Sequence, residues 1–205
     1  MATTTTNFGW DIPQSTDLVK DGATAIETLG DAIDASMNTA LGTKKAGMVL
    51  LNTTSFSGVA SQSINDVFSA TYKSYLILCT YLCATAGPMT MRLRVSGTDN
   101  SAANYGWAYI VARAGYHDST GANTNTSWEV AQCDAYRQNS FSMHLHNPFA
   151  TEYTTFQNSS SSFNNVNQTY FGHSGATSVT TSYTGFTLIP PGNITGSVSI
   201  YGYSV

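Results

Sequence analysis

The chain has 205 residues, which is enough to bury one sizeable core or one core together with a stalk. Only 10% of the residues are charged, but 41% are hydrophobic and 12% aromatic, so the composition is not that of a disordered protein. The net charge of −4, with no basic cluster, excludes nucleic acid as an expected partner. Charge is also uneven, because no charged residue follows Glu152.

The sequence shows no sign of membrane insertion or secretion. It has no run of about eighteen apolar residues, the length that a membrane span needs. Its first residues, MATTTTNFGW, lack the basic and apolar regions of a signal peptide. The odd set of Cys79, Cys83 and Cys133 is not typical of a disulfide framework, so we expect free buried thiols. These features predict synthesis in a reducing cytoplasm.

An arm and one amphipathic helix are predicted at the N-terminus. Residues 1–14 form the arm, because Pro13 disfavours helix in the residue before it. Ser15, Thr16 and Asp17 then supply side-chain oxygens that cap a helix over residues 15–41. Seam residues follow at alternating spacings of three and four, as in a helical bundle, and Met37 extends the pattern roughly: Val19, Gly22, Ile26, Leu29, Ile33 and Met37.

Two packing partners are open for this helix. A single helix of this length is marginal in water, so it packs either on the β domain of its own chain or in a parallel bundle of identical chains. Isoleucine at both kinds of seam position favours three strands. Gly22, Gly30 and Gly42 each weaken the helix by about 1 kcal/mol relative to alanine. A homotrimer would therefore also need the downstream domain to trimerise.

After a linker at residues 42–47, residues 48–205 are predicted to form an antiparallel β-sandwich or jelly-roll-like domain. The strongest strand pattern is at residues 72–83, and further strand patterns occur at 48–51, 63–68, 89–95, 107–111, 127–133, 141–146, 153–157, 178–189 and 194–203. Gly87 and Pro88 mark a turn, from which we expect residues 72–83 and 89–95 to pair as a hairpin. Many short strands without a second helix indicate a mainly β fold.

Three segments are predicted to be polar loops by composition: residues 96–106, 118–126 and 158–167. Loops of a β domain commonly carry its binding specificity, so their residues are candidates for a receptor-facing surface: Asn100, Asn104, Tyr105, Asn123, Asn125, Asn164 and Asn165. The abundance of Tyr, Asn and Ser has two interpretations. Such residues suit a glycan, and they also suit an uncharged surface that resists aggregation.

The residues give no catalytic motif. There is no GxSxG sequence, and the four histidines lie in no recognisable catalytic pattern. Glycoside cleavage needs two carboxylates that flank the bond, and nothing singles out a pair among the acids of the β region. We therefore expect no enzyme activity, no catalytic residue and no cofactor.

His144 and His146 lie two residues apart in a predicted strand, so their side chains share one face. On a three-fold axis, two imidazoles from each chain would supply six nitrogen ligands to a transition metal. The alternative is a pair of surface histidines without a metal, which we favour because a single HxH sequence is a weak signal. No metal is expected.

The N-terminal run FGWDIPQSTDLVKDGATAIETLGDAID resembles a segment of tailed-bacteriophage fibre-like and minor virion structural proteins. In that segment an aromatic-Gly-aromatic arm precedes a DLVxDGAxAIxxLGxxID helix. The resemblance implies that Phe8, Trp10 and Ile12 are virion-docking groups and that the helix begins a trimer. In addition, INDVFSATYKSYLILC, MRLRVSGTDN and the ending GSVSIYGYSV are similar to β-sandwich heads of phage fibre-like proteins. Because phage fibre proteins use HxH sequences to hold a metal, the resemblance also implies an axial iron or zinc at His144 and His146.

This resemblance predicts a virion structural protein that is made in the host cytoplasm. In the leading hypothesis it is a short homotrimeric fibre, mounted by its N-terminus on tail, collar or capsid proteins, whose head attaches to the host surface, where a glycan is one candidate receptor. The alternative is a capsid head-fibre or decoration (cement) protein. A polysaccharide-degrading tailspike is a third hypothesis, for which the chain is too short to hold the usual long β-helix.

Overall fold

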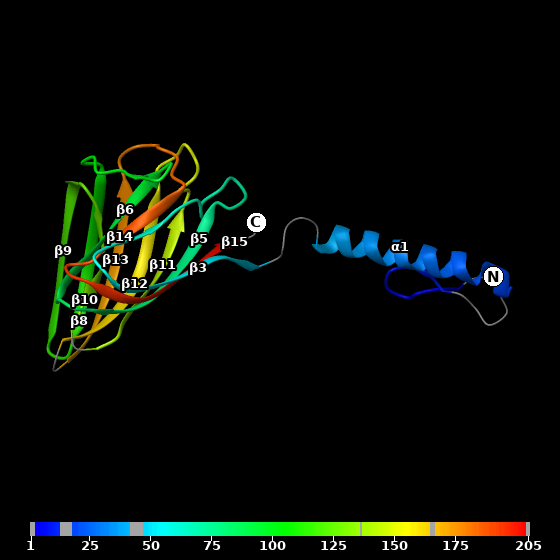
Figure 1. Ribbon diagram of the computed structural model, residues 1–205, viewed down its shortest axis with the longest axis horizontal. Helices are drawn as coiled ribbons and strands as arrows, with labels where there is room; N and C mark the ends of the chain where they lie inside the picture. Colours follow the sequence, from blue (N-terminus) through cyan, green and yellow to red (C-terminus); the bar gives the residue numbers. More distant parts are fainter. Residues whose placement is uncertain (1–2, 13–17, 42–46, 136, 165–166, 204–205) are drawn as a thin grey trace. The chain divides into compact units, whose positions relative to one another are not determined.

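The structure, a computed structural model, describes residues 3–12, 18–41, 47–135, 137–164 and 167–203 (Figure 1). The chain divides into two compact units, Met1–Ala46 and Gly47–Val205. Among the described residues, no helix combines the length and apolar character that a membrane span requires.

The N-terminal unit contains the predicted helix. The short strands β1 (Thr3–Thr4) and β2 (Asp11–Ile12) pair antiparallel in the arm. A 3₁₀ turn at Val19–Asp21 leads into α1 (Gly22–Leu41), whose end agrees with the sequence prediction. The predicted caps Ser15, Thr16 and Asp17 lie outside the described residues.

The second unit is built on two antiparallel sheets, as a β-sandwich requires. The larger sheet has eight strands in the order β3 (Met48–Val59), β15 (Ile194–Tyr203), β5 (Ser74–Cys83), β11 (Asn139–His146), β12 (Thr155–Asn164), β13 (Asn167–Thr177), β8 (Tyr105–Arg113) and β9 (Tyr116–Asn125). The smaller sheet has the order β10 (Trp128–Cys133), β6 (Gly87–Val95), β14 (Gly185–Ile189) and β4 (Gln62–Ile64), with β7 (Thr98–Asp99) paired to β6. The predicted mainly β, antiparallel fold is confirmed.

The core lies between the two sheets because alternate residues of each strand point inward. In β5 the buried row is Tyr75, Ile77, Cys79 and Tyr81. In β6 the buried row is Met89, Met91 and Leu93, and the two arginines of that strand lie on the other face. Trp128 and Phe156 pack against each other in this core, with ring centroids 4.8 Å apart.

The predicted hairpin between residues 72–83 and 89–95 is wrong. β5 pairs with β15 and β11, while β6 pairs with β10 and β14, so the two strands belong to different sheets. The few residues between them cross the sandwich, and Gly87 allows the crossing with a φ of 146°. This arrangement places the apolar rows of β5 and β6 in one core, each contributed by a different layer.

Two of the three predicted polar loops are strands. Residues 118–126 fall mostly in β9, which pairs with β8 at the edge of the large sheet. Residues 158–167 fall mostly in β12 and at the start of β13, which pair with each other. Polar residues suit an exposed edge strand such as β9. In β12 the outward serines are matched by serines of β11, so neighbouring strands supply what the local composition lacks.

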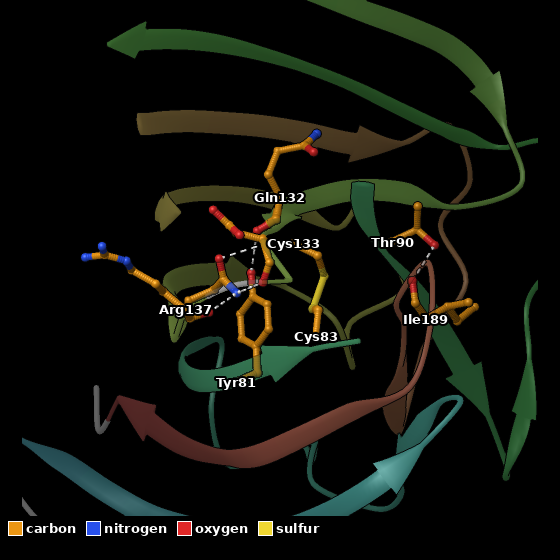
Figure 2. The surroundings of a disulfide bond; sticks show 9 residues. Tyr81, Cys83, Thr90, Gln132, Cys133, Arg137 and Ile189 are labelled. Carbon is orange, nitrogen blue, oxygen red and sulfur yellow. Dashed lines mark hydrogen bonds between the residues drawn. A yellow bond between two sulfur atoms is a disulfide. The ribbon is translucent and has the colours of Figure 1, made fainter. Parts of the chain in front are cut away.

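A disulfide joins the two sheets. Cys83 at the end of β5 and Cys133 at the end of β10 are bonded, with their Cα atoms 5.8 Å apart (Figure 2). The nearby Tyr81 hydroxyl donates to the carbonyl of Gln132 at 3.0 Å, a second link between the same two strands. The prediction of three free thiols is therefore wrong for two of them, because folding brings together residues 50 positions apart. Cys79 is free and buried, as predicted.

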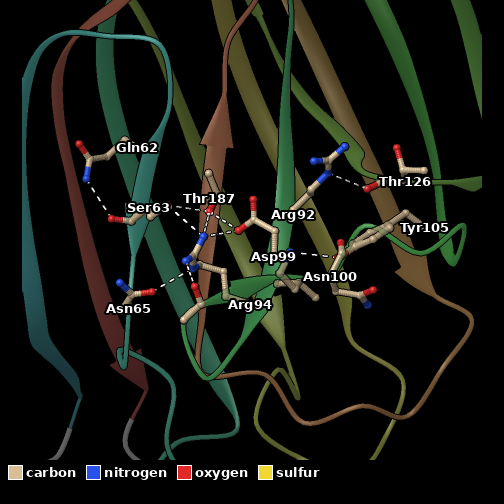
Figure 3. A network of polar contacts seen from close by, with 12 residues as sticks. Gln62, Ser63, Asn65, Arg92, Arg94, Asp99, Asn100, Tyr105, Thr126 and Thr187 are labelled. Atoms are coloured by element: carbon tan, nitrogen blue, oxygen red, sulfur yellow. Dashed lines mark hydrogen bonds and ion pairs between the residues drawn. The ribbon is translucent and has the colours of Figure 1, made fainter.

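A polar network ties the outer side of the small sheet together (Figure 3). Arg94 of β6 forms an ion pair with Asp99 of β7. Its guanidinium also donates to Thr187 of β14 at 2.6 Å and to Ser63 of β4 at 3.0 Å. Four strands are therefore held by one side chain, which fixes their order and register at this edge.

Candidate ligand-binding face

The outward face of the large sheet carries two rows of small hydroxyl side chains. Strand register places Ser197, Thr80, Ser140, Ser161 and Tyr170 in one row across β15, β5, β11, β12 and β13. The adjacent row consists of Ser199, Leu78, Ser142, Ser159 and Gly172. We call these ten residues the serine face. They lie together because side chains alternate between the two faces of a sheet, and the strand register places these residues on the same face.

The serine face is hollowed. A depression of about 430 Å³ lies over it, and its lining includes Tyr170 of β13 and Tyr201 of β15. Within it the hydroxyls of Ser140 and Ser161 are 3.2 Å apart, and those of Ser142 and Ser159 are 3.0 Å apart. The floor is low because serine side chains are short. The two larger tyrosine side chains lie on either side of it, because β5, β11 and β12 separate the strands that carry them.

A further hollow lies closer to β9, and part of its lining consists of side chains that are smaller still. A second depression of about 670 Å³ is lined by Ala108, Gly121, Gly172 and Ser174, with Ile110 exposed beside them. Gly121 is required sterically, because a Cβ there would lie 2.8 Å from the carbonyl oxygen of Trp107. The concavity is thus encoded by residue size along three neighbouring strands.

No formal charge lies on this face within the described residues of the eight strands. Their charged residues are Arg113 and Asp118. Asp118 lies opposite Val111, and Arg113 follows Val111 by two positions, so both share its inward-facing side. Apart from the histidine imidazoles, the outward side therefore presents hydroxyl, amide, aliphatic and aromatic groups, which recognise a ligand through hydrogen bonds and apolar contact.

His144 and His146 share the outward face of β11, as the sequence predicted. Nδ1 of His144 lies 3.1 Å from the hydroxyl of Tyr203, and Nδ1 of His146 lies 3.0 Å from that of Ser74. Burial, with a smaller effect of His144, lowers the pKa of His146 and favours its neutral form. Among the described residues, no cluster of three potential metal-binding side chains occurs.

The structure separates the predicted receptor-facing residues. Tyr105 is fully buried in β8, where its hydroxyl donates to the carbonyl of Asn100 at 2.9 Å. Asn104 is buried, and Asn100 donates to the Tyr183 hydroxyl at 2.8 Å. Tyr105 and Asn104 are buried and leave almost no surface for a receptor contact, so these two do not face a receptor in this structure. Asn100 is half-buried, and its assignment stays a prediction.

The remaining predicted receptor-facing residues are divided between strands and undescribed positions. Asn123 is exposed and Asn125 half-buried, both in β9. Asn164 ends β12, and Asn165 lies outside the described residues.

The serine face was not predicted from the sequence because its residues are scattered over five strands. The signal that could have found it is the alternation of Ser in NSFSMHLH and ITGSVSIYGY, together with the run of four Ser in TFQNSSSSFN.

The predicted docking groups do not extend freely from the helix. Phe8 stacks on Trp10 with ring centroids 4.9 Å apart, and the indole Nε1 of Trp10 donates to Ser36 Oγ at 2.9 Å. Ile12 is half-buried and belongs to β2, which contacts α1. Phe8 itself remains 66% exposed, so it is the docking candidate with the most free surface.

The predicted seam is divided into covered and exposed parts. Gly22, Leu29 and Ile33 are half-buried. Val19, Ile26 and Met37 are 97%, 66% and 53% exposed. An apolar stripe thus runs along the helix unit without cover from the described residues of that unit.

Comparison with known proteins gives no match to a family model, to a curated protein or to a solved structure.

Proposed function

We propose that this chain is a structural protein of a tailed-phage virion, a short homotrimeric fibre that is mounted by its N-terminus and attaches to the host surface through its β head. The observation that carries the proposal is the serine face, a wide concave surface without formal charge on the larger sheet. Glycans of a cell surface present many hydroxyl groups, and such a face offers matching donors and acceptors.

The exposed stripe of the helix supports the trimeric part of the proposal. Val19, Ile26 and Met37 are large apolar side chains on one side of a helix, and such groups are normally covered by a partner. The acids Glu27, Asp31 and Asp34 are all exposed, and at 3.6 residues per turn they lie roughly 80–140° around the helix axis from Ile26. Parallel copies could therefore bury the stripe and keep their acids in water.

Sedimentation of two matched variants tests the trimer. Ile26→Asp with Met37→Asp places charge in the stripe, so a trimer in the unaltered protein should become a monomer. Asn38→Asp adds the same kind of charge on the exposed polar side of α1 and should leave the trimer intact. Loss of the trimer in both variants, or in neither, would contradict the stripe as the interface.

Imaging of intact particles tests the attachment. We expect density on the tail or collar, and loss of host adsorption when the protein is absent. Removal of residues 1–12 should leave a folded head that no longer joins the particle. Density on the capsid shell with unchanged adsorption would instead identify a decoration protein, and the serine face would then be an outer coat.

A further inference from the structure

We propose that the serine face binds a neutral oligosaccharide, with Tyr170 and Tyr201 as apolar platforms at its two sides. The inference rests on the proposed function and specifies its ligand. It also moves the receptor contact from the loops to the middle of a sheet. The depression of about 430 Å³ lies within the usual range for small-molecule sites.

The hydroxyl pairs have bonding capacity left after they contact each other. A serine hydroxyl has one donor and two acceptor positions. In the pairs Ser140–Ser161 and Ser142–Ser159, one hydroxyl donates to the other. Each pair therefore keeps one donor and several acceptor positions for a ligand. A sugar hydroxyl is likewise both donor and acceptor, so it can be accommodated at either member of a pair.

The tyrosines supply the apolar part of the contact. Tyr170 is 49% exposed on β13, and Tyr201 is partly exposed on β15. Aromatic side chains bury much area at low entropic cost and carry a polar tip, which suits ligands with both apolar and hydroxyl surfaces. Leu78 lies between them in the floor of the depression and is 39% exposed.

The absence of charge selects a neutral sugar over an acidic one. Carboxylate, phosphate and sulfate groups are usually held by Arg or Lys. Arg113 is the only such residue within the described parts of the eight strands, and it lies on the inward side. An acidic glycan would lose its hydration on this face without gaining an ion pair.

A protein partner fits this face less well. The centres of protein interfaces are depleted in Ser and Ala and enriched in large aromatic, Met and Arg side chains. The serine face has the opposite composition, with Ser at six of its ten positions. A second copy of the chain placed on it would bring serine rows against each other. We therefore assign the face to a sugar ligand.

Native electrophoresis of the full chain through gels that contain polysaccharide tests the inference. The probes are dextran, mannan and galactan as neutral polymers and polygalacturonate as an acidic one. At least one neutral polymer should retard the protein, and polygalacturonate should not. The inference is overturned if no neutral polymer retards the protein, or if the acidic polymer retards it as strongly.

Two variants and one control locate the site. Tyr170→Ala with Tyr201→Ala should weaken binding by roughly tenfold or more, as removal of central aromatic contacts commonly does. Ser142→Asp should weaken it by placing a charge in the hollow. Tyr153→Ala removes a tyrosine that is 58% exposed outside the strands and should bind as the unaltered protein does. Circular dichroism verifies that each variant folds, and equal binding by all of them would refute the site.

Particles that carry the same variants separate this inference from the proposed function. Normal adsorption by particles with the double tyrosine variant would overturn the sugar site and leave the fibre function standing. Normal adsorption by particles without the protein would refute the fibre function itself. Sedimentation that changes only in the tyrosine variant would show that the face contacts a second copy, which also overturns the sugar assignment.

Discussion

Cys83 and Cys133 form a bond between the last residues of β5 and β10, one strand from each layer of the sandwich. The bond closes a loop with a sequence separation of 50 residues, and disulfides that close loops of this size typically add about 2–4 kcal/mol to the free energy of unfolding. Cys79 lies on the same face of β5 but remains a thiol. The three cysteines thus have two different chemical states in one core.

Thiol titration checks this division. We expect one thiol per chain when unreduced protein is unfolded, and three after reduction. Folded protein should not react with iodoacetamide at pH 8, because burial raises the pKa of the Cys79 thiol to about 12. Cys79→Ala is the control and should give no thiol before reduction. Three thiols in the unreduced protein would contradict the disulfide.

Arg94→Met should lower the free energy of unfolding by about 2–3 kcal/mol, because it leaves Asp99 and the buried Thr187 without their cationic partner. Arg92→Met is the matched control. Arg92 lies on the same face of β6 and donates to the carbonyl of Thr126 at 3.1 Å, so its loss should cost less, about 1 kcal/mol. Urea unfolding at pH 7 measures both. Equal losses would mean that the network adds nothing beyond one hydrogen bond.

His173 makes stability fall as the solution is acidified. It is 3% exposed beside Tyr109 and Phe171, and neither ring nitrogen has a hydrogen-bond partner among the residues that the structure describes. Burial lowers the pKa of His173 to about 4, whereas a histidine in the unfolded chain has a pKa of about 6.5. Between these values the unfolded state binds more protons, so its free energy falls relative to the folded state as pH decreases.

Unfolding of the protein and of His173→Phe at pH 7, 5.5 and 4 measures this effect. The unaltered protein should lose up to about 3 kcal/mol more than the variant over this range, since each unit of pKa shift is about 1.4 kcal/mol. Phenylalanine fits the same aromatic surroundings without a titrating group. Parallel pH profiles for the two proteins would show that another group controls the acid response.

Gly196→Ala should destabilise the β domain by about 2 kcal/mol or more, because the new Cβ would overlap the carbonyl oxygen of Thr80 on the neighbouring strand. The obstacle is backbone in a central strand pair, so it cannot rotate away as a side chain could. Ser197→Ala, the next residue, is the control and should change stability by less than about 0.5 kcal/mol. Thermal unfolding of both variants decides the point.

Apolar alternation was the reliable part of the sequence. It predicted strands over residues 72–83 and 89–95, which correspond to β5 and β6, and the helical spacing of apolar residues predicted α1. In each of these segments the spacing of apolar residues is sufficient to identify the element. Pairing was not predictable in the same way, since β5 and β6 are adjacent in sequence and lie in different sheets.

Polar strands could not be recognised locally. β12 reads TFQNSSSSFN, which lacks the apolar alternation of a half-buried strand. It is a strand because β11 and β13 pair with it on both sides and satisfy its backbone. The candidate site depends on this same pairing, because Ser159 and Ser161 reach the serine face only through it. The site could therefore not be assembled from sequence segments taken one at a time.

A face without fixed charge exerts no long-range force on a molecule that approaches it. Association there is expected to proceed at the ordinary rate for uncharged partners, on the order of 10⁵–10⁶ M⁻¹s⁻¹, and to change little between dilute and saline media. Strength must then come from the lifetime of each contact and from the number of heads that bind together. Retention on a repetitive surface would consequently rise steeply with the number of copies. A single head would dissociate quickly, at nearly the same rate at low and at high salt concentration.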